Sequence, residues 1–105
     1  MRKKIWSKED LVIALFVSKF GIRGLGIDKV YLVREVIKGT TVRSLNLQAA
    51  NIRAMLGLEG RKLYSSSKLK ISVCEEFGLQ PYSILRQIVL KMILKSKEGE
   101  QLELF

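Results

Sequence analysis

The stretch WSKEDLVIALFVSKF, residues 6–20, decides the fold of this chain. Residues 11–17 at its centre are all apolar, which puts apolar side chains on most sides of a helix instead of on a single stripe. Such a helix is stable only where other elements cover it. We therefore expect a helix over this stretch that is deeply buried in the domain.

The residues around the apolar run mark the two ends of this helix. Ser7 can act as the N-cap, and Asp10 stands three residues later, as in a capping box. Trp6 can pack onto Leu11 and so staple the incoming chain to the first turns of the helix. Gly21 supplies a stop at the other end.

Two further helices are predicted on either side of a very short turn. Asp28 is a good cap for the first, whose apolar residues recur at helical spacing until Gly39 stops it. Thr40 or Thr41 can cap the next helix, over about residues 41–56. Two helices joined by a three-residue turn that contains glycine form a helix-turn-helix pattern.

The rest of the chain predicts two more helices and a tail. A polar loop over residues 57–67 ends in a serine run that can cap a short helix over residues 68–77. Pro81 stands at a good first-turn position for the last helix, which we expect to end near Lys95. Residues 96–105 are expected to form a frayed tail.

Length and composition fit one all-α domain over residues 1–95, a compact four- or five-helix unit with a central helix-turn-helix. The chain has 105 residues, of which 48% are hydrophobic and 28% are charged. No apolar stretch reaches the roughly 20 residues that cross a bilayer, and the first ten residues do not resemble a secretory signal. We expect a cytoplasmic protein that does not enter a membrane.

Positive charge is unevenly distributed along the chain, whose formal net charge is +9. Residues 1–70 carry 15 Lys and Arg against 5 Asp and Glu, whereas residues 71–105 carry 4 against 5. Solubility alone does not require this segregation of charge. Binding to a polyanion favours it, because each phosphate that Lys or Arg neutralises releases condensed counterions. The asymmetry favours a nucleic acid as the partner.

Residues that carry catalysis are scarce. The chain has no histidine, which removes the commonest general base and most zinc sites. Its only aspartates, Asp10 and Asp28, stand at predicted helix starts, where they serve as caps. Cys74 lies in an apolar helix pattern, so we expect it to be a buried, unreactive thiol. We expect no enzyme activity, no metal and no cofactor.

The helix over residues 41–56 has two different faces. At 100° per residue, Leu45, Ala49, Ile52 and Leu56 fall on one side, with Gln48 and Met55 beside them, and this side is expected to face the core. The opposite arc combines hydrogen-bonding heads with small side chains, which suits a major groove. The residues of this outer arc are Arg43, Asn46, Leu47, Ala50, Arg53 and Ala54.

The order of these motifs resembles the Myb-like helical domain that precedes the catalytic domain in HNH-type restriction endonucleases. The likeness covers about residues 6–77. It is carried by WSKEDL at 6–11, Gly39-Thr40-Thr41, Ser44-Leu45, Asn51-Ile52, Ser67-Lys68-Leu69 and Glu75-Glu76-Phe77. This sequence has Thr40-Thr41 where the family turn has Arg-Ser, and it lacks the nuclease domain. The resemblance implies DNA binding without cleavage.

We therefore expect a non-catalytic protein whose third helix enters the major groove of double-stranded DNA. Four residues are expected to meet base edges: Arg43, Asn46, Ala50 and Arg53. A second set, from the N-terminal arm, the turn and the polar loop, is expected to hold phosphates. This set comprises Arg2, Lys3, Lys4, Thr40, Thr41, Arg61, Lys62, Lys68 and Lys70.

Two alternatives remain beside duplex DNA. The chain can be a protein-interaction or inhibitor module that binds an acidic partner through its basic face or its last helix. That helix is apolar around more than half of its circumference, which also favours a homodimer with Ile84, Ile88 and Leu94 near the contact. The second alternative is RNA, although few aromatic residues are available for an exposed stacking platform.

Overall fold

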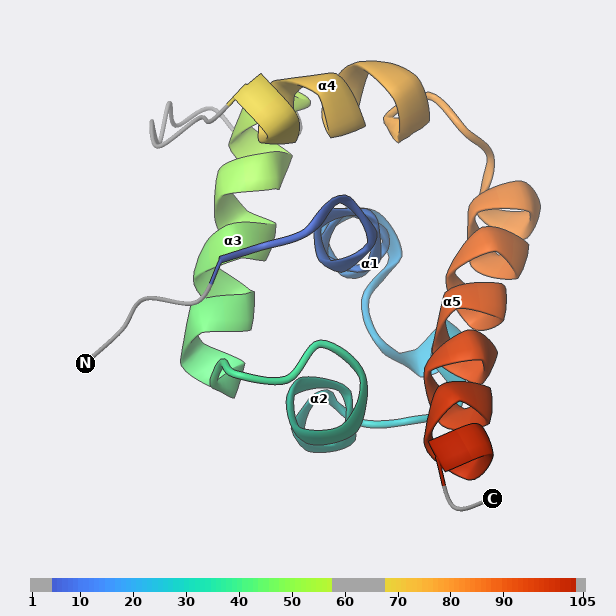
Figure 1. The fold of residues 1–105 in the computed structure, drawn as a ribbon. Helices are drawn as coiled ribbons and strands as arrows, with labels where there is room; N and C mark the ends of the chain where they lie inside the picture. Colours follow the sequence, from blue (N-terminus) through green and yellow to red (C-terminus); the bar gives the residue numbers. More distant parts are fainter. Residues whose placement is uncertain (1–4, 58–67, 104–105) are drawn as a thin grey trace.

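Helix α1 (Lys8–Phe20) lies at the centre of the molecule and the other helices surround it (Figure 1). The computed structural model describes residues 5–57 and 68–103. This part of the chain is helical with no strands, which confirms the all-α class. The elements that follow α1 are η1 (Arg23–Leu25), α2 (Lys29–Tyr31), η2 (Leu32–Val36), α3 (Val42–Met55), α4 (Lys68–Phe77) and α5 (Tyr82–Glu103).

The apolar run of α1 is buried along its whole length, as its sequence predicts. Every residue from Asp10 to Ser18 is buried, and Val12, Ala14, Leu15 and Phe16 are wholly inaccessible to solvent. Helices α3, α4 and α5 all contact α1 and cover it from different sides (Figure 1). Each buried Leu, Ile or Phe contributes about 1.5–3 kcal/mol, so this helix supplies much of the core.

The predicted capping box at the start of α1 is confirmed. The backbone N–H of Asp10 donates to Ser7 Oγ at 3.1 Å, and the backbone N–H of Ser7 donates to Asp10 Oδ2 at 3.2 Å. Trp6 is half-buried and packs against the core cluster, as expected of a staple residue. Gly21 ends the helix with φ +78°, and its N–H donates to Val17 O at 2.9 Å.

The second predicted helix begins as expected and then widens. Asp28 caps it, accepting from the Tyr31 backbone N–H at 2.7 Å. After one α-helical turn the backbone becomes the π-helix η2, which closes with the Ile37 N–H donating to Leu32 O at 2.9 Å. The wider turn keeps Leu32 and Ile37 buried while the chain reverses toward α3.

The turn between η2 and α3 rests on two successive left-handed residues, Lys38 at φ +62° and Gly39 at φ +70°. Lys38 is the non-glycine residue with positive φ in the described ranges. Thr41, and not Thr40, then caps α3 by accepting from the Ser44 backbone N–H at 3.1 Å. The predicted helix-turn-helix is thus formed, with its second helix ending beside Gly57 at φ +74°.

The predicted end of the last helix is wrong, whereas the bounds of the helix before it are confirmed. Helix α4 spans Lys68–Phe77 as predicted, while α5 runs to Glu103 instead of ending near Lys95. The apolar periodicity stops near Lys95, but nothing in the following residues breaks a helix except Gly99, which a helix tolerates at a cost of about 1 kcal/mol. No helix among the described residues is both long enough and apolar enough to cross a membrane.

The turn geometry predicts opposite effects at two adjacent positions. Gly39→Ala should lower the free energy of unfolding by about 1–2 kcal/mol, because a side chain is unfavourable in the left-handed region. Lys38→Gly should leave it unchanged or raise it by up to about 1 kcal/mol, since relief of that strain offsets the added chain entropy. Urea denaturation measures both changes. A Gly39→Ala variant as stable as the wild type would contradict this turn.

Candidate nucleic-acid interface

Helix α3 turns the predicted side toward the core. Leu45 and Ile52 are fully buried and Ala49 is nearly so, while Leu56 is half-buried against the same cluster. Contacts with α1 and α4 hold this side in place. The inward face read from helical periodicity is therefore confirmed, and the position of the outward face follows from it.

The outer face of α3 is a narrow strip that carries one exposed charged side chain and one exposed apolar side chain. Arg43 is exposed in the first turn, and the side chain of Leu47, one turn later, is 62% exposed. Ala50 and Ala54 continue the strip and are half-buried. Small side chains along the middle of an exposed helix allow a flat or grooved partner to approach its backbone closely.

Asn46 lies at the edge of this strip and is already paired. Its Oδ1 accepts from Lys29 Nζ at 2.7 Å, which links the start of α2 to the second turn of α3. An ammonium only donates, so the amide oxygen must face Lys29 and the amide NH₂ is left for another partner. The pair therefore presents donors from the amide NH₂ and the ammonium, and Asn46 Oδ1 keeps a second lone pair.

Arg53 has a structural task that its predicted place on the outer arc did not indicate. Its side chain is half-buried, and Nη1 donates to Ser18 O at 2.6 Å. Ser18 O belongs to the last turn of α1, where carbonyl groups lack partners within the helix. Arg53 thus caps the central helix, and its assignment to the outward arc is corrected.

Two other cations also bind backbone carbonyl groups. Lys19 Nζ donates to Gly78 O at 2.6 Å, just past the end of α4, and Arg86 Nε donates to Gly24 O at 2.6 Å. Both contacts join segments that are far apart in the sequence. Part of the chain's positive charge therefore stabilises the fold.

Lys70 was expected to contact a phosphate, but the structure buries it. Its side chain is only 4% exposed, and desolvation lowers its pKa from the ordinary value of 10.5. Spacing explains the burial, because Lys70 lies three and seven residues before Val73 and Phe77, on the inward face of α4. A buried ammonium is not available to a phosphate. Lys68, at the first position of α4, is exposed as expected.

The remaining predicted phosphate contacts divide into two groups. Thr40 is half-buried and Thr41 is exposed but serves as the cap of α3, with its hydroxyl also donating to Ser44 Oγ at 3.2 Å. The other five lie outside the described residues, so the structure does not place them. These are Arg2, Lys3, Lys4, Arg61 and Lys62.

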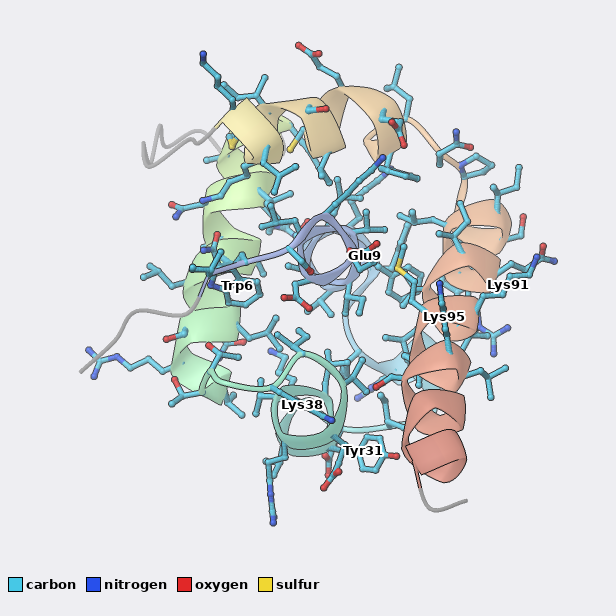
Figure 2. All side chains as sticks on the ribbon, in the orientation of Figure 1. Trp6, Glu9, Tyr31, Lys38, Lys91 and Lys95 are labelled. Carbon is cyan, nitrogen blue, oxygen red and sulfur yellow. The ribbon has the colours of Figure 1, made fainter. Side chains whose placement is uncertain are left out.

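Two further cations lie on the helix-turn-helix itself, although the sequence did not assign them to DNA. Arg34 is exposed on η2, and Lys38 is exposed in the turn before α3. The acidic residues in this segment are Asp28, which caps α2, and Glu35. Figure 2 shows Lys38 on this side of the molecule, while Lys91 and Lys95 lie on α5.

Helix α4 carries an exposed pair of acidic side chains. Glu75 and Glu76 are exposed near the end of α4, and Glu76 pairs with Lys8 at 3.3 Å. In the described ranges, no group of three or more His, Cys, Asp and Glu side chains is placed to hold a metal ion. Cys74 is half-buried beside Lys70, and desolvation raises its pKa.

Comparison with protein-family models, curated proteins and solved structures found no match. The functional argument therefore starts from the geometry of the helix-turn-helix. That geometry brings together Arg43, Ala50 and Asn46 with the additional donor Lys29, and it separates them from Arg53 and Lys70.

The buried lysine generates a test of α4. Lys70→Met should raise the free energy of unfolding at pH 7, because methionine fills the site without a charge that burial disfavours. The folded chain binds the Lys70 proton more weakly than the unfolded chain. The stabilisation by methionine should therefore shrink as the pH rises toward 10.5.

Urea denaturation at pH 7 and pH 10 measures this effect, and Lys68→Met is the matched control. Lys68 is exposed on the same helix, so its replacement should change stability by no more than about 0.5 kcal/mol. A Lys70→Met variant less stable than the wild type at pH 7 would show that the buried ammonium is favourable.

Proposed function

We propose that the chain is a non-catalytic protein that binds double-stranded DNA through the outer face of α3. One observation carries the proposal: the second helix of a helix-turn-helix exposes Arg43 and Leu47 and continues their face with the small, half-buried Ala50. The second helix of this motif is the element that enters the major groove. The sequence resemblance to Myb-like domains favours the same use.

The strip suits the major groove in three ways. Arg43 projects from the first turn of α3, where a guanidinium can donate two hydrogen bonds to guanine O6 and N7. Leu47 offers an apolar surface to a thymine methyl group. Ala50 and Ala54 leave the helix thin enough to approach the base edges.

The pairing of Lys29 with Asn46 refines the expected contact to adenine. A bidentate contact to adenine needs the amide as donor and acceptor together, and Asn46 Oδ1 keeps a second lone pair beside the bond from Lys29. We infer that the contact with Lys29 orients the amide, and that the Lys29 ammonium adds a donor for acceptors such as guanine O6, guanine N7, thymine O4 or a phosphate.

Phosphate contacts come from the cations beside the strip. Arg34 and Lys38 lie on the helix and turn that precede α3, and Lys68 begins α4. These residues fix the register of a helix in the groove and carry no base preference themselves. The basic residues predicted in the N-terminal arm and in the loop between α3 and α4 complete this set in the proposal.

A matched pair of substitutions tests the DNA interface. Arg43→Gln should weaken binding to a preferred duplex by about 5- to 150-fold, the equivalent of 1–3 kcal/mol for a bidentate base contact. Lys91→Gln removes the same charge from exposed α5, across α1 from α3 (Figure 1), and should change affinity less than twofold. Fluorescence anisotropy at constant salt measures both. If both variants weakened binding equally, nonspecific charge attraction would explain the affinity, and the proposed contact of Arg43 with a base would be wrong.

The two substitutions must be compared on a folded background. Arg43 is exposed and lies outside the core, so the thermal midpoint of Arg43→Gln should stay near that of the wild type. Affinity should also fall steeply between 50 and 200 mM salt, by about 10³-fold for six phosphate contacts. Affinity that does not depend on salt would contradict binding to the DNA backbone.

A protein-interaction module that docks through α5 is the second candidate. The side chains of Ile84 and Leu94 are 47% and 58% exposed, while Ile88 is half-buried against the core. Polar Gln87 and Lys91 lie on the same outward face, so the apolar surface is interrupted. This makes α5 a less continuous docking surface than its sequence predicts.

Sedimentation of a double variant tests the α5 interface. If α5 forms a homodimer, wild-type protein should sediment as a dimer at high concentration, and Ile84→Ser with Leu94→Ser should shift it to the monomer. Both positions are exposed, so folding should be retained. If the wild-type protein remained monomeric under these conditions, the homodimer hypothesis would be wrong. The proposal would then be a monomer that binds DNA.

A further inference from the structure

An open groove lies between η1 and the first turns of α5, away from the proposed DNA interface. Its walls comprise Arg23, Gly24 and Gly26 on one side and Tyr82, Ser83, Arg86 and Gln87 on the other. Helices α3 and α5 lie on opposite sides of α1 (Figure 1). A duplex that follows α3 therefore does not account for this groove.

One wall of the groove is fixed by an aromatic cluster. The Tyr82 ring lies 5.0 Å from the Phe20 ring and 5.7 Å from the Phe16 ring, between ring centres. Phe16 is fully buried in α1, so the cluster is anchored in the core. A Cβ atom added at Gly24 would overlap the Tyr82 hydroxyl, so the absence of a side chain at Gly24 allows the two walls to approach closely.

Arg86 is held in a defined orientation across the groove. Its Nε donates to Gly24 O at 2.6 Å, which ties α5 to η1 and fixes the plane of the guanidinium group. That bond uses one of its five N–H donors, and the Nη atoms have no hydrogen bond to the residues that the structure describes. The guanidinium can thus accept a second partner without losing its structural contact.

The groove contains donors and no acid among the described residues. Arg23 is exposed and lines the groove opposite Arg86, and Ser83 and Tyr82 contribute hydroxyl groups. No described carboxylate lines the groove to neutralise the two guanidinium groups. The N-terminal end of the long helix α5 adds a favourable field for a negative charge, in support of the side chains.

We propose that this groove binds a phosphate monoester, with Arg23 and Arg86 contacting its oxygens and Ser83 donating a further hydrogen bond. Planar guanidinium groups match the spacing of phosphate oxygens and bind them in pairs. A phosphate monoester carries close to two negative charges at pH 7, which matches the two arginines better than a carboxylate does. The phosphate can belong to a free nucleotide or to the 5′ end of a DNA strand.

NMR titration of the isotope-labelled full chain tests this site. Inorganic phosphate and adenosine monophosphate should shift the backbone amide signals of Gly24, Ser83 and Gln87, whereas sodium chloride at equal ionic strength should not. Arg23→Gln should weaken binding of both anions at least tenfold. Lys95→Gln removes one positive charge from an exposed position near the far end of α5 and is the control, with an expected change below twofold. Arg23 is exposed, so the spectrum of its variant should otherwise remain that of the wild type.

A second arm distinguishes the two sources of phosphate. An oligonucleotide with a 5′-phosphate that binds more tightly than adenosine monophosphate, and loses this advantage in Arg23→Gln, assigns the site to a DNA end. Equal or tighter binding of the mononucleotide assigns it to a free nucleotide. Equal effects of Arg23→Gln and Lys95→Gln, or no shift at the three amides, would overturn the proposal. The α3 interface would be unaffected, because Arg43 plays no part in the groove.

Discussion

The fold depends on the need to bury α1 on all sides. A helix with a single apolar stripe can lie on a surface, but residues 11–17 leave this helix no polar side to expose. The other helices each supply one apolar face to cover it, and their order in the chain carries them around it (Figure 1). The capping box at Ser7 and Asp10 completes the exposed end of α1.

The same constraint separates the cations that stabilise the fold from those that stay exposed. Carbonyl groups at the ends of packed helices need donors, and Lys19 and Arg53 reach across to supply them. Arg86 joins α5 to η1 in the same manner. The exposed cations Arg34, Lys38 and Arg43 lie instead on the helix-turn-helix. A count of charges along the sequence combines these two uses, and only the contacts separate them.

Local signals in the sequence predicted most of the fold. Capping residues such as Ser7, Asp28 and Thr41 identified the helix starts because their hydrogen bonds are made within a few residues. The π-helical η2 had no such local mark, since a widened turn follows from how Leu32 and Ile37 pack. The end of α5 was placed too early because apolar periodicity marks packing and not helix length.

The candidate site was predicted less fully, because long side chains reach beyond their own helix. Arg53 is on the edge of the outer arc by angle, yet its guanidinium bends back to Ser18 O. The burial of Lys70 was readable from its spacing to Val73 and Phe77, whereas the contact between Lys29 and Asn46 depends on how α2 meets α3. Periodicity identifies a face, but tertiary contacts determine which residues on that face remain available.

Cross-saturation from a DNA duplex to the methyl groups of deuterated protein measures the central claim directly, because it reports which face touches DNA irrespective of affinity changes. If α3 enters the groove, the methyl signals of Leu47 and Ala50 should lose the most intensity, while those of Ile84 and Leu94 on α5 should be unaffected. Loss of intensity at Ile84 and Leu94 with none at Leu47 and Ala50 would contradict the proposed interface.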